Sequence, residues 1–193
     1  CVGYMVPGAI GDSENGEARM VMTPWSDNAM PFEKAAETGT EKVITEHSTI
    51  GMLITTDGSI GDIPRESYLP AEERIVMELK ELGKPCAMIL NSADPTNENS
   101  ITLAYELEEK YSVPVALVSC IDLDAEDIRH ILELVLHEFP VTEIRVSLPE
   151  WTTALEDGHK IKSSILSSIK SCADRVTKTG DIKDAFSTLG DNE

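Results

Sequence analysis

Three polar side chains follow an apolar run in the middle of the sequence, where they have the hydrogen-bonding capacity to hold a ligand. The run covers residues 86–90, and Asn91, Ser92 and Asp94 come directly after it. In an open parallel sheet, ligands bind beyond the carboxyl ends of the strands. If residues 86–90 form a buried strand, these side chains stand where a base edge could be read. The same residue types also form ordinary turns and cap helices, so a purely structural role stays open.

The loop at 91–94 resembles the base-reading loop of GTPase-like domains, whose usual form is Asn-Lys-x-Asp. In that loop the Asn ties neighbouring loops together, the Lys stem packs along the base, and the Asp accepts two hydrogen bonds from a guanine edge. Here Ser92 stands in place of the Lys, so the stacking stem is missing, while Asp94 remains. We predict nucleotide binding by Asn91, Ser92 and Asp94, and this loop alone does not decide which base they read.

A second polar loop follows the next apolar run, which covers residues 113–118. Ser119 and Cys120 lie where GTPase-like domains have a short loop whose backbone touches the base. Alone this pair indicates little, but it follows Asn91 across one predicted helix and one predicted strand. Because both loops come at strand ends and in the expected order, we predict that they face one nucleotide.

The chain opens with Cys1-Val2-Gly3, which fits the tail of an Asp-x-x-Gly motif whose Asp would precede residue 1. In such motifs the Asp holds Mg²⁺ and the Gly N–H approaches the γ-phosphate. The sequence contains no Gly-x-x-x-x-Gly-Lys-Ser/Thr phosphate-binding loop. We therefore expect Gly3 to bind nucleotide. We expect no catalytic or metal-binding residue within the chain, because those groups would lie upstream of Cys1 in a domain truncated at its N-terminus.

Other titratable side chains predict less. Asp57 and Asp62 flank a Gly-rich turn, where carboxylates could bind Mg²⁺ or act in acid–base chemistry, although solvated turn residues are commoner. His130 and His137 lie on a predicted helix without a metal-ligand partner at a suitable spacing. We do not predict a site at either pair.

Hydrophobic periodicity indicates the elements that must position these loops. Short apolar runs of strand length alternate with longer segments of helical period, which indicates a parallel sheet with right-handed crossovers. The predicted strands cover 50–56, 86–90 and 113–118, and the predicted helices cover 31–47 (interrupted at Gly39), 70–82, 98–111 and 125–138. The predicted fold class is α/β, a three-layer P-loop NTPase-like (GTPase-like) domain whose mostly parallel sheet carries helices on both faces.

The two ends of the chain follow different patterns. Residues 1–31 are rich in Gly, Pro and polar residues and are predicted to form a long irregular loop. Residues 141–148 alternate like an edge strand, and residues 151–178 carry a further helical pattern. We divide the chain into 1–140, the C-terminal portion of a nucleoside-triphosphatase domain, and 141–193, an edge strand, a helix and the start of a connection to a missing following domain.

Composition narrows the classes of function. The formal net charge is −19, which repels nucleic-acid phosphates at long range, so we expect no nucleic-acid partner. The four cysteines have no Cys-x-x-Cys spacing, which favours a reducing cytoplasm over a disulfide framework or a zinc site. We find no apolar stretch of the roughly 20 residues that a membrane span needs.

Long and unusual strings in the chain resemble the stage IV sporulation protein A family. The resemblance runs from residue 1 to about residue 155, and the strings that carry it are 1–9, 23–25, 43–51, 55–60, 62–66, 72–74, 78–85 and 91–92. Within this family, the residues expected to bind nucleotide are Gly3, Asn91, Ser92, Asp94, Ser119 and Cys120.

The resemblance implies a morphogenetic ATPase of endospore-forming bacteria, related to translation-factor GTPases, that uses ATP and Mg²⁺. Hydrolysis would drive self-assembly into the base layer of the spore coat, in the mother-cell cytoplasm at the forespore outer surface. The implied partners are further copies of the protein, a small amphipathic membrane-anchoring peptide and other spore coat proteins. Two alternatives stay open, namely a non-catalytic scaffold with a degenerate nucleotide domain and a GTPase.

Overall fold

The computed structural model describes residues 2–14 and 16–187. The chain divides into two compact units, residues 1–135 and residues 136–193, and each is described by itself. The first unit holds the parallel sheet and the loops that the sequence marks as candidate sites. The second unit holds short helices and an extended segment.

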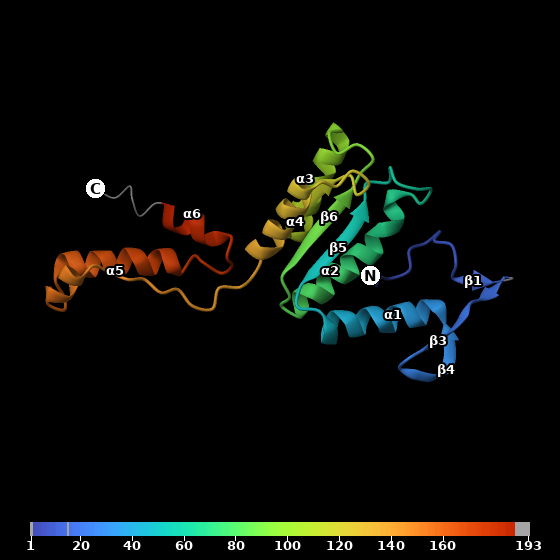
Figure 1. Ribbon diagram of the computed structural model, residues 1–193, viewed down its shortest axis with the longest axis horizontal. Coiled ribbons are helices and arrows are strands. Elements are labelled where there is room, and N and C mark those ends of the chain that lie inside the picture. The colour runs from blue at the N-terminus through green and yellow to red at the C-terminus, as the bar shows by residue number, and fades with distance from the viewer. Residues whose placement is uncertain (1, 15, 188–193) are drawn as a thin grey trace. The chain divides into compact units, whose positions relative to one another are not determined.

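Three parallel strands form the sheet of the first unit, in the order β5 (Gly51–Thr56), β6 (Cys86–Asn91) and β7 (Val115–Val118) (Figure 1). Their carboxyl ends are in register, because Thr56 pairs with Asn91 and Asn91 pairs with Val118. The loops that follow the three strands therefore start side by side at one edge of the sheet.

Helices α2 (Leu69–Glu81), α3 (Glu98–Tyr111) and α4 (Ala125–His137) connect or follow the strands. Alternate side chains of a strand point to opposite faces of a sheet. One face packs against α2 and α3 in a core that includes Leu53, Met88, Leu90, Val76, Leu79 and Leu107. The other face packs against α4 in a core that includes Ile89, Ala116, Val118 and Ile131. The predicted α/β class, with a parallel sheet and helices, is confirmed.

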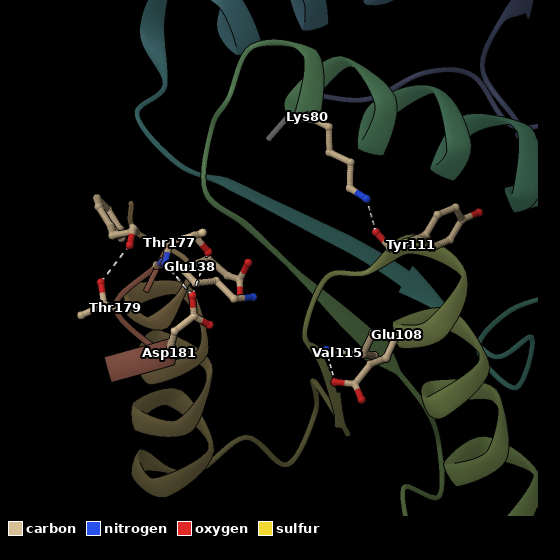
Figure 2. Close-up of polar contacts among 10 residues, drawn as sticks. Lys80, Glu108, Tyr111, Val115, Glu138, Thr177, Thr179 and Asp181 are labelled. Atoms are coloured by element: carbon tan, nitrogen blue, oxygen red, sulfur yellow. Dashed lines mark hydrogen bonds and ion pairs between the residues drawn. The ribbon is translucent and has the colours of Figure 1, made fainter. Parts of the chain in front are cut away.

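A polar network fixes the end of the sheet opposite the candidate site. Figure 2 shows the Lys80 ammonium on the carbonyl oxygen of Tyr111, the last residue of α3. The backbone N–H of Val115 donates to Glu108 Oε1 at 2.9 Å. These two contacts fasten the end of α3 to α2 and to the first residue of β7, so the helices cannot slide along the sheet.

Gly39 was expected to interrupt the first helix, and this expectation is wrong. Helix α1 (Phe32–Lys42) runs through Gly39 and continues as a π-helical turn, Val43–His47. Gly39 is buried, and a Cβ added there would stand 3.5 Å from the Trp25 ring. This is an ordinary van der Waals distance, and α1 accommodates the glycine without ending. After the π-helical turn, the Lys84 ammonium donates to carbonyls at its end, among them Ser48 O at 2.6 Å.

The prediction of an irregular loop over residues 1–31 is wrong for its second half. Two antiparallel hairpins lie there, formed by β1 (Ser13–Glu14) with β2 (Glu17–Ala18) and by β3 (Met20–Thr23) with β4 (Ser26–Pro31). Gly16 has φ +84°, a left-handed conformation that favours glycine. These hairpins need only local pairing, so their short strands carry too little apolar pattern to be recognised.

The predicted edge strand over residues 141–148 is also wrong, since these residues, all of which the structure describes, form no strand. An alternating pattern makes a strand only where another strand can pair with it, and here an isolated bridge pairs Pro140 with Lys178. The single helix predicted over 151–178 is divided into a 3₁₀ turn (Glu150–Ala154) and α5 (Lys160–Ala173), separated at Gly158 with φ +94°. A short α6 (Asp181–Ser187) follows.

The turn before α6 is closed by one carboxylate. Asp181 Oδ2 accepts from the backbone N–H groups of Thr177 and Lys178, both at 2.9 Å, and from the Thr177 hydroxyl at 2.8 Å (Figure 2). The backbone hydrogen bonds from Lys178 and Thr177 lower the pKa of Asp181 below its ordinary value. The Thr179 hydroxyl also donates to the carbonyl of Phe139, which ties the turn to the segment that follows α4.

A buried carboxylate joins the end of β5 to α2. Glu72, only 2% exposed, lies in the first turn of α2 and accepts from both terminal nitrogens of Arg65, one of them at 2.8 Å. The Thr55 hydroxyl of β5 donates to the same carboxylate. A carboxylate so far from water is tolerated only when its charge is paired and its oxygens are hydrogen-bonded. This group therefore fixes the whole segment between β5 and α2.

We expect Glu72→Gln to lower the free energy of unfolding by about 3 kcal/mol, because the amide leaves the Arg65 charge buried without a counter-ion. Glu73→Gln is the matched control, since Glu73 is exposed and its ion pair with Lys110 lies in water. An exposed pair contributes about 0.5 kcal/mol. Urea unfolding followed by circular dichroism compares the two variants, and equal losses would contradict a structural role for the Glu72 group.

Candidate functional site

Asn91 connects all three loops at the carboxyl edge of the sheet. Its side-chain Oδ1 accepts from the backbone N–H of Cys120 at 2.9 Å, and its carbonyl oxygen accepts from the N–H of Asp57 at 3.4 Å. The structure thus brings Asn91 and Cys120 together, two residues singled out in the sequence. Since the Asn91 side chain is engaged with the backbone, its role is to hold the loops in place for whatever lies over them.

Ser92 lies beneath the loop and does not face outward. It is 1% exposed, and its backbone N–H donates to the carbonyl of Val118 at 2.9 Å. Its hydroxyl accepts from the N–H of Asp94 at 3.1 Å and lies 3.4 Å from the hydroxyl of Ser100. The small side chain therefore supports the loop from below.

Asp94 is exposed at the tip of the same loop. Its Oδ1 accepts both from the backbone N–H of Thr96 at 3.0 Å and from the Thr96 hydroxyl at 2.6 Å. Asn97, the N-cap of α3, follows directly, and its side chain accepts from the N–H of Asn99. One oxygen of Asp94, Oδ1, is thus used within the loop, and neither hydrogen bond from Thr96 involves Oδ2.

The loop after β7 is a tight turn. The Ser119 hydroxyl donates to Asp122 Oδ2 at 2.9 Å, and the N–H of Asp122 donates back to the carbonyl of Ser119 at 3.1 Å. Ser119 and Cys120 are half-buried. Their backbone is held from within the turn and, through Cys120, by Asn91, so the loop presents a fixed surface at the sheet edge.

Gly3 does not join these residues. It lines a separate apolar hollow of about 460 Å³ along β5, together with Tyr4, Ile44 and Gly51. The neighbouring Tyr4 is held by the Arg74 guanidinium, 3.7 Å from its ring centroid, and by Glu78. Burial and the hydrogen bond to Glu78 raise the pKa of Tyr4. The segment that carries Gly3 is therefore anchored on α2, away from the base-loop candidates.

A pocket of about 310 Å³ opens beside the loop of Asn91, and most of its polar lining was missed by sequence reasoning. It is lined by Asp57, Ser59, Ser92, Ala93, Asp94, Asn97, Asn99, Ser100 and Leu103. Ser59 and Ser100 gave no signal, because isolated serines are common and these two, one in the loop after β5 and one in the first turn of α3, lie far apart along the chain. The position of Asp57 directly after a strand was the available clue.

Asp57 organises that pocket. Its Oδ2 accepts from the Ser100 hydroxyl at 2.7 Å, and its Oδ1 accepts from the backbone N–H of Ser59 at 2.9 Å and from the Ser59 hydroxyl. Ser59 Oγ in turn accepts from the N–H of Ala93 at 2.8 Å. Burial raises the pKa of Asp57, but the hydrogen bonds from Ser59, Ser92 and Ser100 outweigh burial and lower this pKa to about 2. The carboxylate therefore stays charged.

Among the described residues, no group of three or more His, Cys, Asp or Glu side chains is placed to hold a metal ion. In the same part of the chain, none of the helices combines the length and the apolar character that a membrane crossing requires. The sheet edge offers hydrogen bonding from fixed backbone groups, from serine hydroxyls and from the carboxylates of Asp57, Asp94 and Asp122.

Comparison with known proteins assigns the whole chain. A family model described as stage IV sporulation protein A, ATPase domain, matches residues 1–140, and a model for the middle domain of the same protein matches residues 141–193. The chain belongs to the stage IV sporulation protein A family. The resemblance, which the sequence carries from residue 1 to about residue 155, is confirmed, and the family match extends to residue 193.

Curated members of the stage IV sporulation protein A family give the same result. The chain is 51% identical to the Clostridioides difficile protein over 95% of its own length, and 44% and 45% identical to the Bacillus subtilis and Bacillus anthracis proteins over 94%. It spans only 37% of the length of each of these relatives. No solved structure matches the chain.

We expect Asp57→Asn to change how stability depends on pH. The folded pKa of about 2 lies below the unfolded value of about 3.9, so the charged carboxylate stabilises the fold by about 1–2 kcal/mol above pH 5. This contribution is lost as the pH falls through 2. Urea unfolding between pH 3 and 7 measures it. The difference in free energy of unfolding between wild type and variant is expected to become smaller below pH 4. A difference that is the same at every pH would contradict the lowered pKa of Asp57.

Proposed function

We propose that the chain is part of a protein that binds and hydrolyses ATP and self-assembles on the forespore surface as the base layer of the spore coat. The observation that carries this proposal is the match of residues 1–140 to an ATPase domain, in which the loops after β6 and β7 meet at the carboxyl edge of the sheet through Asn91 and Cys120. Nucleotides bind at this edge in sheets of parallel strands.

Within the proposal, the domain is a GTPase-like member of the P-loop class, and the fixed loops form the base side of its nucleotide site. Asn91 holds the site together, Ser92 supports it from below, and the backbone of Ser119 and Cys120 borders the base. Asp94 is the side chain at the tip whose oxygen can receive a donor from the base. The preference for ATP over GTP follows from the family to which the chain belongs.

The phosphate side of the site would come from other parts of the full-length protein. Gly3 lies in the segment where an Asp-x-x-Gly motif would end, and it is our candidate for a γ-phosphate contact. Mg²⁺ would be held by that motif's Asp and by the phosphates. Residues 1–140 are thus proposed as the C-terminal portion of the ATPase domain, and residues 141–193 as the first part of the domain that follows.

The proposed partners are further copies of the protein, a small amphipathic membrane-anchoring peptide and other spore coat proteins, in the mother-cell cytoplasm. The net charge of −19 disfavours nucleic acid as a partner because phosphates are repelled. An assembly of such acidic subunits must also overcome its own repulsion, which salt screens. Assembly in the full-length protein is therefore expected to be salt-dependent.

In the full-length protein, we expect Mg²⁺-dependent ATP hydrolysis that Asn91→Ala lowers at least tenfold, because the loop of Cys120 loses its anchor. Asn28→Ala is the matched control, since Asn28 is an exposed residue of β4 far from these loops in sequence. Phosphate release at saturating ATP and GTP measures both. If the protein hydrolyses neither nucleotide, it is a non-catalytic scaffold. If it hydrolyses GTP alone, it is a GTPase.

The β1–β2 hairpin follows the Gly3 segment, where nucleotide-dependent switches lie in GTPase-like domains, and we propose that it couples hydrolysis to assembly. The N–H of Arg19 donates to the carbonyl of Asp12 at 2.9 Å and closes the hairpin, so deleting residues 13–18 removes it without touching β3. The deletion is expected to keep ATP turnover within about twofold while sedimentation of polymer falls. Unchanged assembly would refute the coupling.

A further inference from the structure

One of the two carboxylate oxygens of Asp94, at the tip of the loop after β6, is hydrogen-bonded to Thr96. Asp94 Oδ1 accepts two hydrogen bonds from Thr96, one from its backbone N–H at 3.0 Å and one from its hydroxyl at 2.6 Å. A carboxylate oxygen has two lone pairs, so both of the favourable acceptor directions of Oδ1 are taken. Oδ2 remains available to a ligand.

A guanine edge needs two free acceptor oxygens, and the Asp94 carboxylate has one. Guanine presents two parallel donors, N1–H and N2–H, and a carboxylate pairs with two such donors by giving one oxygen to each. With Oδ1 engaged by Thr96, one guanine donor would enter the site without a partner, and an unpaired polar group is a strong basis for rejection. Adenine has no hydrogen on N1 and no amino group at C2, so it brings neither of these two donors and leaves none of them unpaired when Oδ1 is engaged.

Hydrogen bonds from below hold the backbone of the loop that carries Asp94. The N–H of Asp94 donates to Ser92 Oγ at 3.1 Å, and Ser92 is almost fully buried. The N–H of Ala93 donates to Ser59 Oγ at 2.8 Å, and Ser59 is fixed by Asp57. The backbone of the loop is thus anchored from below, and the orientation of the Asp94 carboxylate upon it is set by the two hydrogen bonds from Thr96.

We propose that Thr96 is a specificity-determining residue of the nucleotide site, which excludes guanine by holding one oxygen of the Asp94 carboxylate. The inference rests on the proposed nucleotide function and deepens it, because it names the residue that sets the choice of base. The polar group that reads guanine in GTPase-like loops is retained here, and its neighbour two residues later changes what it can accept.

The test compares binding of ATP and GTP to the full-length protein with Thr96→Val and Thr96→Ser. Valine has the shape of threonine without its hydroxyl, so it frees one acceptor direction of Oδ1, whereas serine keeps the hydroxyl. Isothermal titration with Mg-ATP and Mg-GTP gives the two Kd values. We expect Thr96→Val to tighten GTP binding about tenfold while ATP binding changes less than threefold, and we expect Thr96→Ser to resemble wild type.

A second change shows whether the effect passes through the carboxylate. In the double variant Thr96→Val with Asp94→Ala, the gain in GTP affinity is expected to disappear. A Thr96→Val variant with an unchanged GTP affinity, or with a gain that persists without Asp94, overturns the proposal while leaving ATP binding and the proposed function intact. If the wild-type protein binds neither nucleotide, the proposed function itself is wrong, and the inference falls with it.

Discussion

The Glu72 carboxylate lies out of water between β5 and α2, and its charge is tolerated there only because Arg65 and Thr55 share it. Desolvation of such a group costs several kcal/mol unless its partners are in place. The three residues come from β5, from a 3₁₀ turn at Arg65–Tyr68 and from α2, so they can meet only when the segment after β5 has taken its final path. Asp57 begins that segment, and its contacts with Ser59 and Ser100 depend on the same path.

The candidate site is therefore formed by loops that hold one another in place through hydrogen bonds. Asn91 links the loop of Cys120 to the backbone of Asp57, and the Ser59 hydroxyl accepts a hydrogen bond from the N–H of Ala93 in the loop after β6. None of these contacts uses a side chain of unusual chemistry. Preorganised hydrogen bonds cost no reorganisation when a ligand arrives, which suits the base-reading role proposed for this site.

The sequence predicts the elements of the first unit well, because buried parallel strands and amphipathic helices leave strong periodic patterns. It also predicts that Asn91 and Cys120 meet, since the ends of parallel strands lie at one edge. It does not predict the roles of Ser59, in the loop after β5, or of Ser100, in α3, because the two residues are distant along the chain and meet only in the folded structure. The strand predicted over residues 141–148 is wrong. An alternating apolar pattern shows which residues would share a face of a strand, but it does not show whether a partner strand is present.

The parallel register of the sheet has a consequence for how the protein forms. Gly51 pairs with Cys86, and Met88 pairs with Val115, so each pairing must close a long stretch of chain that contains a whole helix. Such non-local contacts lose chain entropy before they gain packing, and they form slowly. The hairpins β1–β2 and β3–β4 close over a few residues on the microsecond scale. The hairpin region is therefore expected to fold early, and the edge of the sheet that would hold the nucleotide is assembled last.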